Sequence, residues 1–327
     1  MQERESPLIT FGPVPSRRLG RSLGINNIPA KHCSYSCLYC QVGPTAGQED
    51  VPRSFYPPNE IQRSVAQRVD TAHRSGEQID YLTLVPDGEP TLDVNLAETI
   101  ELLRPLGIKI AVISNASLLW RKEVQARLYK ADWVSLKVDA TNESLWRTVN
   151  RPHEHLSLEQ ILNGIRAFAQ GFDGVLATET MLLAGINDGP VSVNGVADFL
   201  AEVNPDKAYL AVPTRPPAEP DIRVPDELAL VRAYNILESK GVNIEYLVGD
   251  EGDSFALAGG VEAELLAIMA VHPMRREAVE TLLAKADADW GVVDKLESEG
   301  KLKHVAYTDR IFYVRRFPEK IIVLRDT

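Results

Sequence analysis

Between residue 23 and about residue 248, short apolar runs alternate with longer segments in which apolar residues recur at helical spacing. Seven runs rich in β-branched and apolar residues are predicted to be strands: 22–28, 81–85, 109–114, 133–140, 176–183, 208–212 and 243–248. Helix-like segments such as 58–76 and 93–107 separate them. Repeated strand–helix units build a parallel sheet that binds ligands in the loops after its strands. The alternation therefore predicts an α/β domain with its functional site in those loops.

A second, smaller domain is predicted after this region. Residues 249–260, GDEGDSFALAGG, are rich in Gly, Asp and Ser and are interpreted as a linker. Residues 261–327 contain three short helix-like segments and two alternating strands joined at Asp309, the order of a winged-helix-like α+β domain. The predicted division is a lead-in at 1–22, the α/β domain at 23–248, the linker, and the winged-helix-like domain.

The composition is that of an ordinary globular protein, with 44% hydrophobic and 25% charged residues among 327. No apolar run approaches the roughly 18 residues of a membrane span, and the first residues lack the pattern of a secretory signal. Three cysteines cannot all pair with one another, so the thiols are expected to be reduced. We therefore expect a cytoplasmic protein with no membrane partner.

The charge distribution bears on macromolecular partners. The formal net charge of −11 argues against a generally basic surface for nucleic acid. Residues 287–299, around the third helix of the predicted winged helix, carry five acidic residues and one basic residue, a net −4 that would repel DNA. The predicted wing is basic, so contact with a peptide or RNA through the C-terminal domain stays open; its basic residues are Lys301, Lys303, Arg310, Arg315 and Arg316.

All the cysteines of the chain, Cys33, Cys37 and Cys40, lie within eight positions after the first predicted strand. Spacings of two to four residues are typical of thiolate ligands to a metal ion or an iron–sulfur cluster. A structural zinc ion would need a fourth ligand, and the nearby candidate is His32. A second interpretation is that the three thiols are buried as small apolar side chains. The third interpretation is a [4Fe–4S] cluster in which one iron has no protein ligand.

The segment CSYSCLYC (33–40) resembles the Cys-x3-Cys-x2-Cys signature of the radical S-adenosylmethionine (SAM) superfamily, including the aromatic Tyr39. The likeness is to the branch related to wyosine-forming tRNA enzymes and continues through GEPTL (88–92), SNASLL (114–119), KVDA (137–140), NRPH (150–153) and ETMLLAGIND (179–188). It implies a partial (β/α)6 TIM-type barrel, one [4Fe–4S] cluster on Cys33, Cys37 and Cys40, and SAM bound at the open iron. It also implies an electron donor of the flavodoxin or ferredoxin type.

The resemblance further implies which side chains meet the cofactor. PDGEPTL corresponds to the superfamily's Gly-Gly-Glu region, so Glu89 and Gly88 are candidates for the cofactor's ammonium group. The other cofactor-binding candidates are Tyr39, Ser114, Asn115, Asp139 and Glu179. Structural alternatives stay open, because Thr91, Asp93, Asn115 or Asp139 could instead cap the following helix.

Lys137 is the candidate catalytic residue. By the strand period of two, Lys137 and Asp139 point to the same face of the sheet, and an inward-facing lysine is costly unless it meets an anion. That anion could be a substrate group or the carboxylate of Glu179. Four arginines are candidates for binding an anionic substrate, with solvated surface arginine as the alternative: Arg17, Arg18, Arg21 and Arg215.

Three functions stay open at this stage. The first is a radical SAM enzyme whose 5′-deoxyadenosyl radical abstracts hydrogen from a small molecule or a nucleic-acid base. The second is a radical SAM enzyme that modifies or activates a peptide or protein, and the third is a zinc-stabilised binding protein without catalysis. No cysteine remains for a second cluster, which argues against wyosine formation itself and against sulfur insertion.

Overall fold

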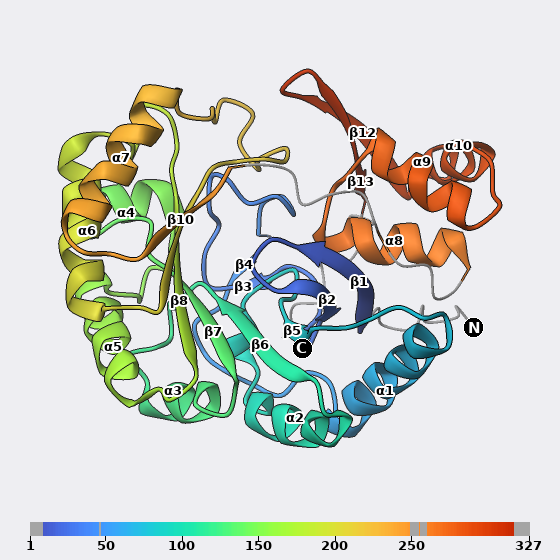
Figure 1. Cartoon of the computed structure of the whole chain (residues 1–327), viewed down its shortest axis with the longest axis horizontal. Coiled ribbons are helices and arrows are strands. Elements are labelled where there is room, and N and C mark those ends of the chain that lie inside the picture. Colours follow the sequence, from blue (N-terminus) through green and yellow to red (C-terminus); the bar gives the residue numbers. More distant parts are fainter. Residues whose placement is uncertain (1–8, 46, 249–254, 256–259, 317–327) are drawn as a thin grey trace, which may run out of the picture.

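The computed structural model describes residues 9–45, 47–248, 255 and 260–316 (Figure 1). Its main feature is an eight-stranded sheet that curls into an open half-barrel, in the order β1-β2-β5-β6-β7-β8-β9-β10. The strands are β1 (Thr10–Ser16), β2 (Gly20–Ile25), β5 (Tyr81–Leu84), β6 (Lys109–Ser114), β7 (Trp133–Lys137), β8 (Val175–Met181), β9 (Lys207–Ala211) and β10 (Ile244–Leu247). From β2 to β10 all neighbours are parallel. The predicted partial barrel is therefore confirmed.

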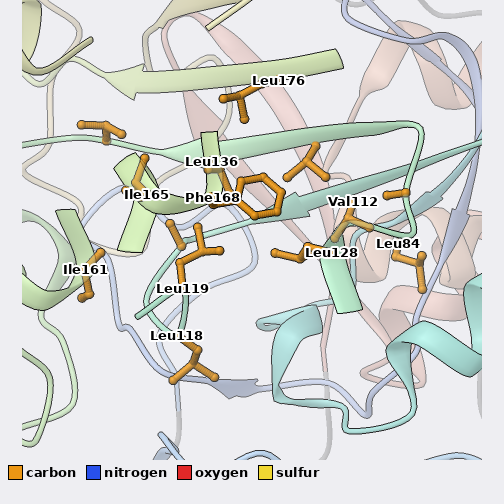
Figure 2. Close-up of a cluster of buried hydrophobic side chains, with 14 of the residues drawn as sticks. Leu84, Val112, Leu118, Leu119, Leu128, Leu136, Ile161, Ile165, Phe168 and Leu176 are labelled. Carbon is orange, nitrogen blue, oxygen red and sulfur yellow. The ribbon is translucent and has the colours of Figure 1, made fainter. Parts of the chain in front are cut away.

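Helices cover the outer face of this sheet (Figure 1). They are α1 (Pro58–Arg74), α2 (Leu96–Leu103), α3 (Lys122–Leu128), α4 (Glu143–Asn150), α5 (Leu158–Gly171), α6 (Pro190–Val203) and α7 (Glu227–Ser239), with 3-10 turns η1 (Pro90–Leu92) and η2 (Arg104–Leu106). Between helices and sheet lies one apolar core; Figure 2 shows Val112, Leu136 and Phe168 within it. Burying a side chain such as Phe168, which is fully shielded, stabilises the fold by about 1.5–3 kcal/mol.

The sequence prediction missed β1, which was assigned to the lead-in. This strand pairs antiparallel with β2 and forms an edge of the sheet. It contains two prolines, Pro13 and Pro15, which an edge strand tolerates because it need not use every backbone N–H in the sheet. The turn after β1 reaches across the open side of the half-barrel, where Arg17 Nη2 donates to the carbonyl oxygen of Leu247 at 3.1 Å. The first and last parts of the sheet are thereby joined through a side chain.

The C-terminal segment folds against β1. It contains α8 (Val261–Val271), β11 (Met274–Arg275), α9 (Arg276–Lys285), α10 (Gly291–Ser298), β12 (Leu302–Tyr307) and β13 (Arg310–Arg315), with a sheet order β11-β13-β12. α8 lies beside β1 (Figure 1). Phe11 and Val14 of β1 share an apolar cluster with Leu265 and Ile268 of α8. A salt bridge between Arg68 on α1 and Glu264 on α8 adds a second attachment.

The expected helices and hairpin of this segment are present, together with the short strand β11 that was not predicted. The winged-helix-like assignment and the domain boundaries stay predictions. The predicted linker falls mostly outside the described residues, apart from Phe255 and Gly260. No helix in the described ranges is both long and apolar enough to cross a bilayer.

Candidate active site

A cavity of about 310 Å³ lies inside the half-barrel, bordered by the cysteine loop (residues 33–40), the strand ends, the β1–β2 turn and the end of α8. The predicted site residues that line it are Arg17, Arg18, Cys33, Cys37, Tyr39, Cys40, Gly88, Glu89, Ser114, Asn115, Lys137, Glu179 and Arg215. Among the described residues, Asp139 and Arg21 are not part of the lining. The structure thus brings most of the predicted residues to one place.

The cysteine loop is fixed to the last turn of α4 and to the segment after it. A β-bridge joins Tyr35 to Pro152, and the Leu38 backbone N–H donates to the carbonyl oxygen of Val149 at 3.0 Å. Two amides approach the sulfurs: Nδ2 of Asn115 lies 3.6 Å from Cys33 Sγ, and Nδ2 of Asn150 lies 3.5 Å from Cys37 Sγ. N–H donors to cluster sulfurs are one of the levers by which proteins set a cluster's reduction potential.

The electrostatics of the three thiols are unusual for free cysteine. Burial raises the pKa of Cys37 to about 12, with the negative charge of Asp139 as a further cause. Burial likewise raises the pKa of Cys33 and Cys40. Three thiolates would be unfavourable together in this cavity without positive charge beside them, and bound iron supplies such charge. The sulfur donors on one wall therefore fit a [4Fe–4S] cluster with one iron left open.

The zinc alternative needed His32 as a fourth ligand. Nδ1 of His32 is hydrogen-bonded to Glu49 Oε1 at 2.6 Å, and the ring packs on Phe55 with centroids 5.2 Å apart. Glu49 and Phe55 thus hold the imidazole in place, and His32 is not part of the cavity lining that holds the cysteines. Among the described residues, the group of possible metal ligands within 4.8 Å of one another contains neither His32 nor a cysteine. Ligands of one tetrahedral zinc ion lie about 3.4 Å apart, so the wider spacing of these sulfurs favours the cluster.

Gly88 and Glu89 attach the end of β5 to the cysteine loop. Gly88 has a φ of +156°, and a Cβ there would lie 2.0 Å from the carbonyl oxygen of His32, so glycine is required for the close approach. The Glu89 N–H donates to that same oxygen at 2.9 Å. The Glu89 carboxylate accepts hydrogen bonds from the Thr91 backbone N–H and hydroxyl, the Ser114 hydroxyl, and the Asn115 backbone N–H. Glu89 therefore braces two strand ends and caps η1. The following helix, α2, has Asn95 at its N-cap without a side-chain cap bond, and the Asn95 N–H donates to Asp93 Oδ1 at 2.9 Å.

Asp139 holds a second bracing position. Its carboxylate accepts hydrogen bonds from the Tyr39 hydroxyl, from Asn150 Nδ2 at 2.7 Å and from the Met181 N–H at 2.8 Å. It does not cap the next helix, because Asn142 caps α4. Asp139 thus ties the cysteine loop to the ends of β7 and β8 from behind the cavity wall.

The charged floor of the cavity consists of Arg18, Lys137 and Glu179. Lys137 and Glu179 are register partners on β7 and β8, and their side chains form a salt bridge. Arg18, from the β1–β2 turn, pairs with the other carboxylate oxygen. Burial lowers the pKa of Lys137. The sequence alternative of a Lys137–Glu179 pair is therefore present, and each charge is only slightly exposed, between 7% and 17%.

The predicted substrate-binding arginines do not all lie at the cavity. Arg17 and Arg18 line the cavity, whereas Arg21 pairs with Glu77 and donates its backbone N–H to Asp80 near the amino end of β5. Ser22, the next residue of β2, lines the cavity. Successive side chains of a strand point to opposite faces, so the Arg21 side chain points away from the cavity, and proximity in sequence to Arg17 misled the prediction.

Arg215 lies at the rim beside the C-terminal segment. Its guanidinium donates to Gln41 Oε1 at 2.6 Å and to His272 Nε2 at 3.0 Å, so that nitrogen of His272 acts as the acceptor. Gln41 also donates to the Val271 carbonyl oxygen at 3.2 Å. The residue after the last cysteine is thus connected to the end of α8.

Sequence reasoning missed His272, Gln41 and the pair Lys31–Asp87. His272 follows α8, far along the chain, and no motif marks it. Asp87 is buried, its carboxylate lies 3.0 Å from Lys31 Nζ, and burial raises its pKa to about 6. In the sequence, the only indication of the Lys31–Asp87 pair was the position of Lys31, two residues before Cys33.

Known proteins are similar to this chain in sequence and fold. The Radical SAM superfamily profile matches residues 27–193. A UPF0026 protein of Methanocaldococcus jannaschii is 45% identical over 314 residues, 95% of this chain and 97% of that one. A UPF0026 protein of Helicobacter pylori strain 26695 is 35% identical over 219 residues, 65% of this chain and 68% of that one.

Among solved structures, Streptococcus suis SuiB bound to S-adenosylmethionine superposes with a TM-score of 0.51 at 16% identity, over 68% of this chain and 49% of that one. At this identity the likeness shows the fold. This likeness of fold agrees with the match to the family profile and with the relative that aligns over 95% of this chain. The chain belongs to the radical SAM superfamily and is a radical SAM enzyme.

Proposed function

We propose that Cys33, Cys37 and Cys40 hold one [4Fe–4S] cluster whose open iron binds SAM. When bound, these groups supply the radical chemistry: one electron from a flavodoxin- or ferredoxin-type donor cleaves SAM to methionine and a 5′-deoxyadenosyl radical, which takes a hydrogen atom from the substrate to give 5′-deoxyadenosine and a substrate radical. The observation that carries the proposal is that three partly buried thiols line one cavity in a chain of this family.

The protein's own residues position the cysteine loop and form the wall of the cavity. Asn115 and Asn150 direct amide N–H groups at two of the sulfurs, which orients the loop and stabilises negative charge on it. Glu89 donates its backbone N–H to the carbonyl oxygen of His32, next to the loop, and Asp139 accepts the hydroxyl of Tyr39 within it, so both residues hold the loop in place. A fixed wall would hold the reacting groups in place and limit the access of water to them on that side.

The charged floor supports an anionic group on the substrate or cofactor. Two cations, Arg18 and Lys137, share the single carboxylate of Glu179. A carboxylate or phosphate entering the cavity could take hydrogen bonds from either cation without leaving Glu179 unpaired. This supports a small anionic molecule or a nucleic-acid base carrying phosphate as the substrate class.

A peptide or protein substrate is the alternative. Val271 and His272, at the end of α8, are part of the cavity lining, and Tyr307 of the β12–β13 hairpin donates to the Pro213 carbonyl oxygen at 3.1 Å. The C-terminal segment therefore narrows the cavity on that side rather than leaving a groove for an extended chain. That arrangement favours the small substrate.

Cleavage of SAM can be tested without knowing the substrate. Protein reconstituted with iron and sulfide under anaerobic conditions is incubated with SAM and dithionite, and 5′-deoxyadenosine is quantified by chromatography. We expect the wild type to bind the cluster and form product, and Cys37→Ala to lose both. Ser36→Ala, a neighbouring change that leaves all three sulfurs, should keep iron content and product.

Two results would contradict the proposal. Full iron content and product in Cys37→Ala would mean that the ligand assignment is wrong. A wild type that takes up zinc at the cysteines, and no iron under reconstitution, would return the zinc-stabilised binding protein as the better account.

A further inference from the structure

A second group of metal-ligating side chains lies outside the cavity, at Asp50, His153 and His155. One ligand atom from each falls within 4.8 Å of the other two. The Asp50 carboxylate oxygens are 3.9 Å from His153 Nδ1 and 3.4 Å from His155 Nδ1. Two ligands of one tetrahedral zinc ion, each at about 2.1 Å from it, are about 3.4 Å apart. The spacing therefore matches shared coordination after a shift of a few tenths of an ångström at His153.

The two segments that carry these residues are fixed in advance. Asp50 follows β4 (Gly47–Gln48), and the preceding Glu49 N–H donates to the Cys33 carbonyl oxygen at 3.0 Å. His153 donates its own N–H to the Ser34 carbonyl oxygen at 2.9 Å. Both ligand-bearing segments are thus anchored on the cysteine loop, so little ordering would be needed to bind an ion.

The donor set selects the kind of ion. Two imidazoles and one carboxylate suit Zn²⁺ and similar divalent transition metals, whereas Mg²⁺ and Ca²⁺ prefer oxygen ligands alone. The side chains of Asp50 and His153 are mostly shielded, at 14% and 19% exposure, while that of His155 is 68% exposed. An ion could enter from the His155 side and keep a water ligand there.

Competing partners of the three side chains are weak. The guanidinium of Arg121 bonds the main-chain oxygen of Asp50 at 3.3 Å rather than its carboxylate. His153 Nδ1 accepts the His155 backbone N–H at 3.3 Å, near the long limit for a hydrogen bond. A metal ion would take that lone pair, and the displaced N–H, on an exposed residue, could bond water instead.

We propose that Asp50, His153 and His155 bind one Zn²⁺ ion at a site separate from the cysteines. The ion joins the segment after β4 to the segment after α4, and both of these contact the cysteine loop. Its role is to clamp the outer side of that loop. The alternative for the same side chains is a set of histidine–carboxylate ion pairs with no metal.

The test uses the full-length, untagged protein with its cysteines occupied by the cluster, so that thiols do not compete for zinc. Zinc is titrated by calorimetry, and metal content is measured after buffer exchange. We expect one zinc per chain in addition to the cluster iron. Asp50→Asn and His155→Ala should each weaken binding at least about tenfold, since even outer partners of a metal site contribute 10–100-fold.

His304→Ala is the matched control. His304 Nδ1 pairs with Glu297 Oε1 at 2.8 Å, an exposed histidine–carboxylate pair that is not in the three-ligand group. This variant should bind zinc as the wild type does. The proposal is overturned if the wild type binds no zinc, or if Asp50→Asn and His155→Ala bind it as tightly as the wild type. His155 is exposed, so a folding failure is not expected for its variant, and circular dichroism checks this.

Discussion

The cysteine-loop wall and the charged floor of the cavity both bury carboxylates, but they stabilise them in opposite ways. Glu89 and Asp139 are bonded by neutral hydroxyl, amide and backbone donors. Glu179 is bonded by two cations. Neutral donors at fixed backbone positions hold one geometry, whereas side-chain cations can change partners. The difference indicates that the first region is scaffold for the cluster and the second is the part that can respond to a ligand.

The largest effect is expected at Gly88, where the scaffold has no room for change. Gly88→Ala places a methyl group against the His32 carbonyl oxygen and imposes a φ of +156° on alanine. The combined strain costs about 3 kcal/mol or more and displaces the start of the cysteine loop. Iron content after reconstitution should fall several-fold, measured by metal analysis.

Gly107→Ala is the control for backbone strain alone. Gly107 also has a positive φ, +71°, but nothing lies within 4 Å of the position that an added methyl group would take. Its iron content should match the wild type. Equal iron content in both variants would show that the Gly88 contact does not support the cluster.

A smaller effect is expected from breaking the charged floor. Glu179→Gln leaves Lys137 and Arg18 without their shared anion and should lower the free energy of unfolding by about 3 kcal/mol. Adding Lys137→Met should recover part of this loss, because one of the two buried cations is then removed as well. Urea denaturation of the three proteins measures the coupling.

Glu89→Gln sharpens the contrast. It keeps the side-chain shape but turns an amide N–H toward one of the donors, at a cost of about 1–3 kcal/mol. No single second substitution should rescue it, since its donors come from Thr91, Ser114 and Asn115 together. If a second substitution restored the stability of Glu89→Gln, or if Lys137→Met did not restore any stability to Glu179→Gln, the cysteine-loop wall and the charged floor would not differ in the way described.

The smallest effect concerns pH. Burial raises the pKa of Asp87 to about 6, while an unfolded chain titrates near 3.9. The folded state therefore binds this proton more tightly, and between about pH 4 and pH 6 stability from Asp87 falls as pH rises, by at most about 1 kcal/mol per pH unit. Asp87→Asn should lack this contribution.

Melting temperatures of wild type and Asp87→Asn across that range measure the difference. Burial also raises the pKa of Asp93 to about 6, but Asp93 is present in both proteins and cancels in the comparison. Parallel curves for the two proteins would contradict the assignment to Asp87.

The half-barrel was predictable because its strands are apolar runs bounded by helical segments. The run 109–114 matches β6 in full, and the other six predicted strands differ from the structure at their ends. Strand β1 was not predictable in the same way, since its burial comes from packing on α8, a contact between residues about 250 positions apart.

The site residues also differ in whether local sequence or distant contacts place them. Cys33, Cys37 and Cys40 are a local motif, so spacing sufficed to find them. Arg21 was predicted to lie at the cavity because of its neighbours in sequence, but the alternation of side chains along β2 turns Ser22 toward the cavity and Arg21 toward Glu77. His272 reaches the rim because α8 is docked on β1, and no spacing in the sequence encodes that.

The docking of α8 beside β1 has a consequence for the chain as a whole. β1 is an edge strand, and an uncovered edge offers backbone N–H and C=O groups to any passing strand. Phe11 and Val14 would also be uncovered if α8 were removed. A barrel without its C-terminal segment would thus be prone to self-association. The segment therefore limits aggregation and also forms one border of the cavity.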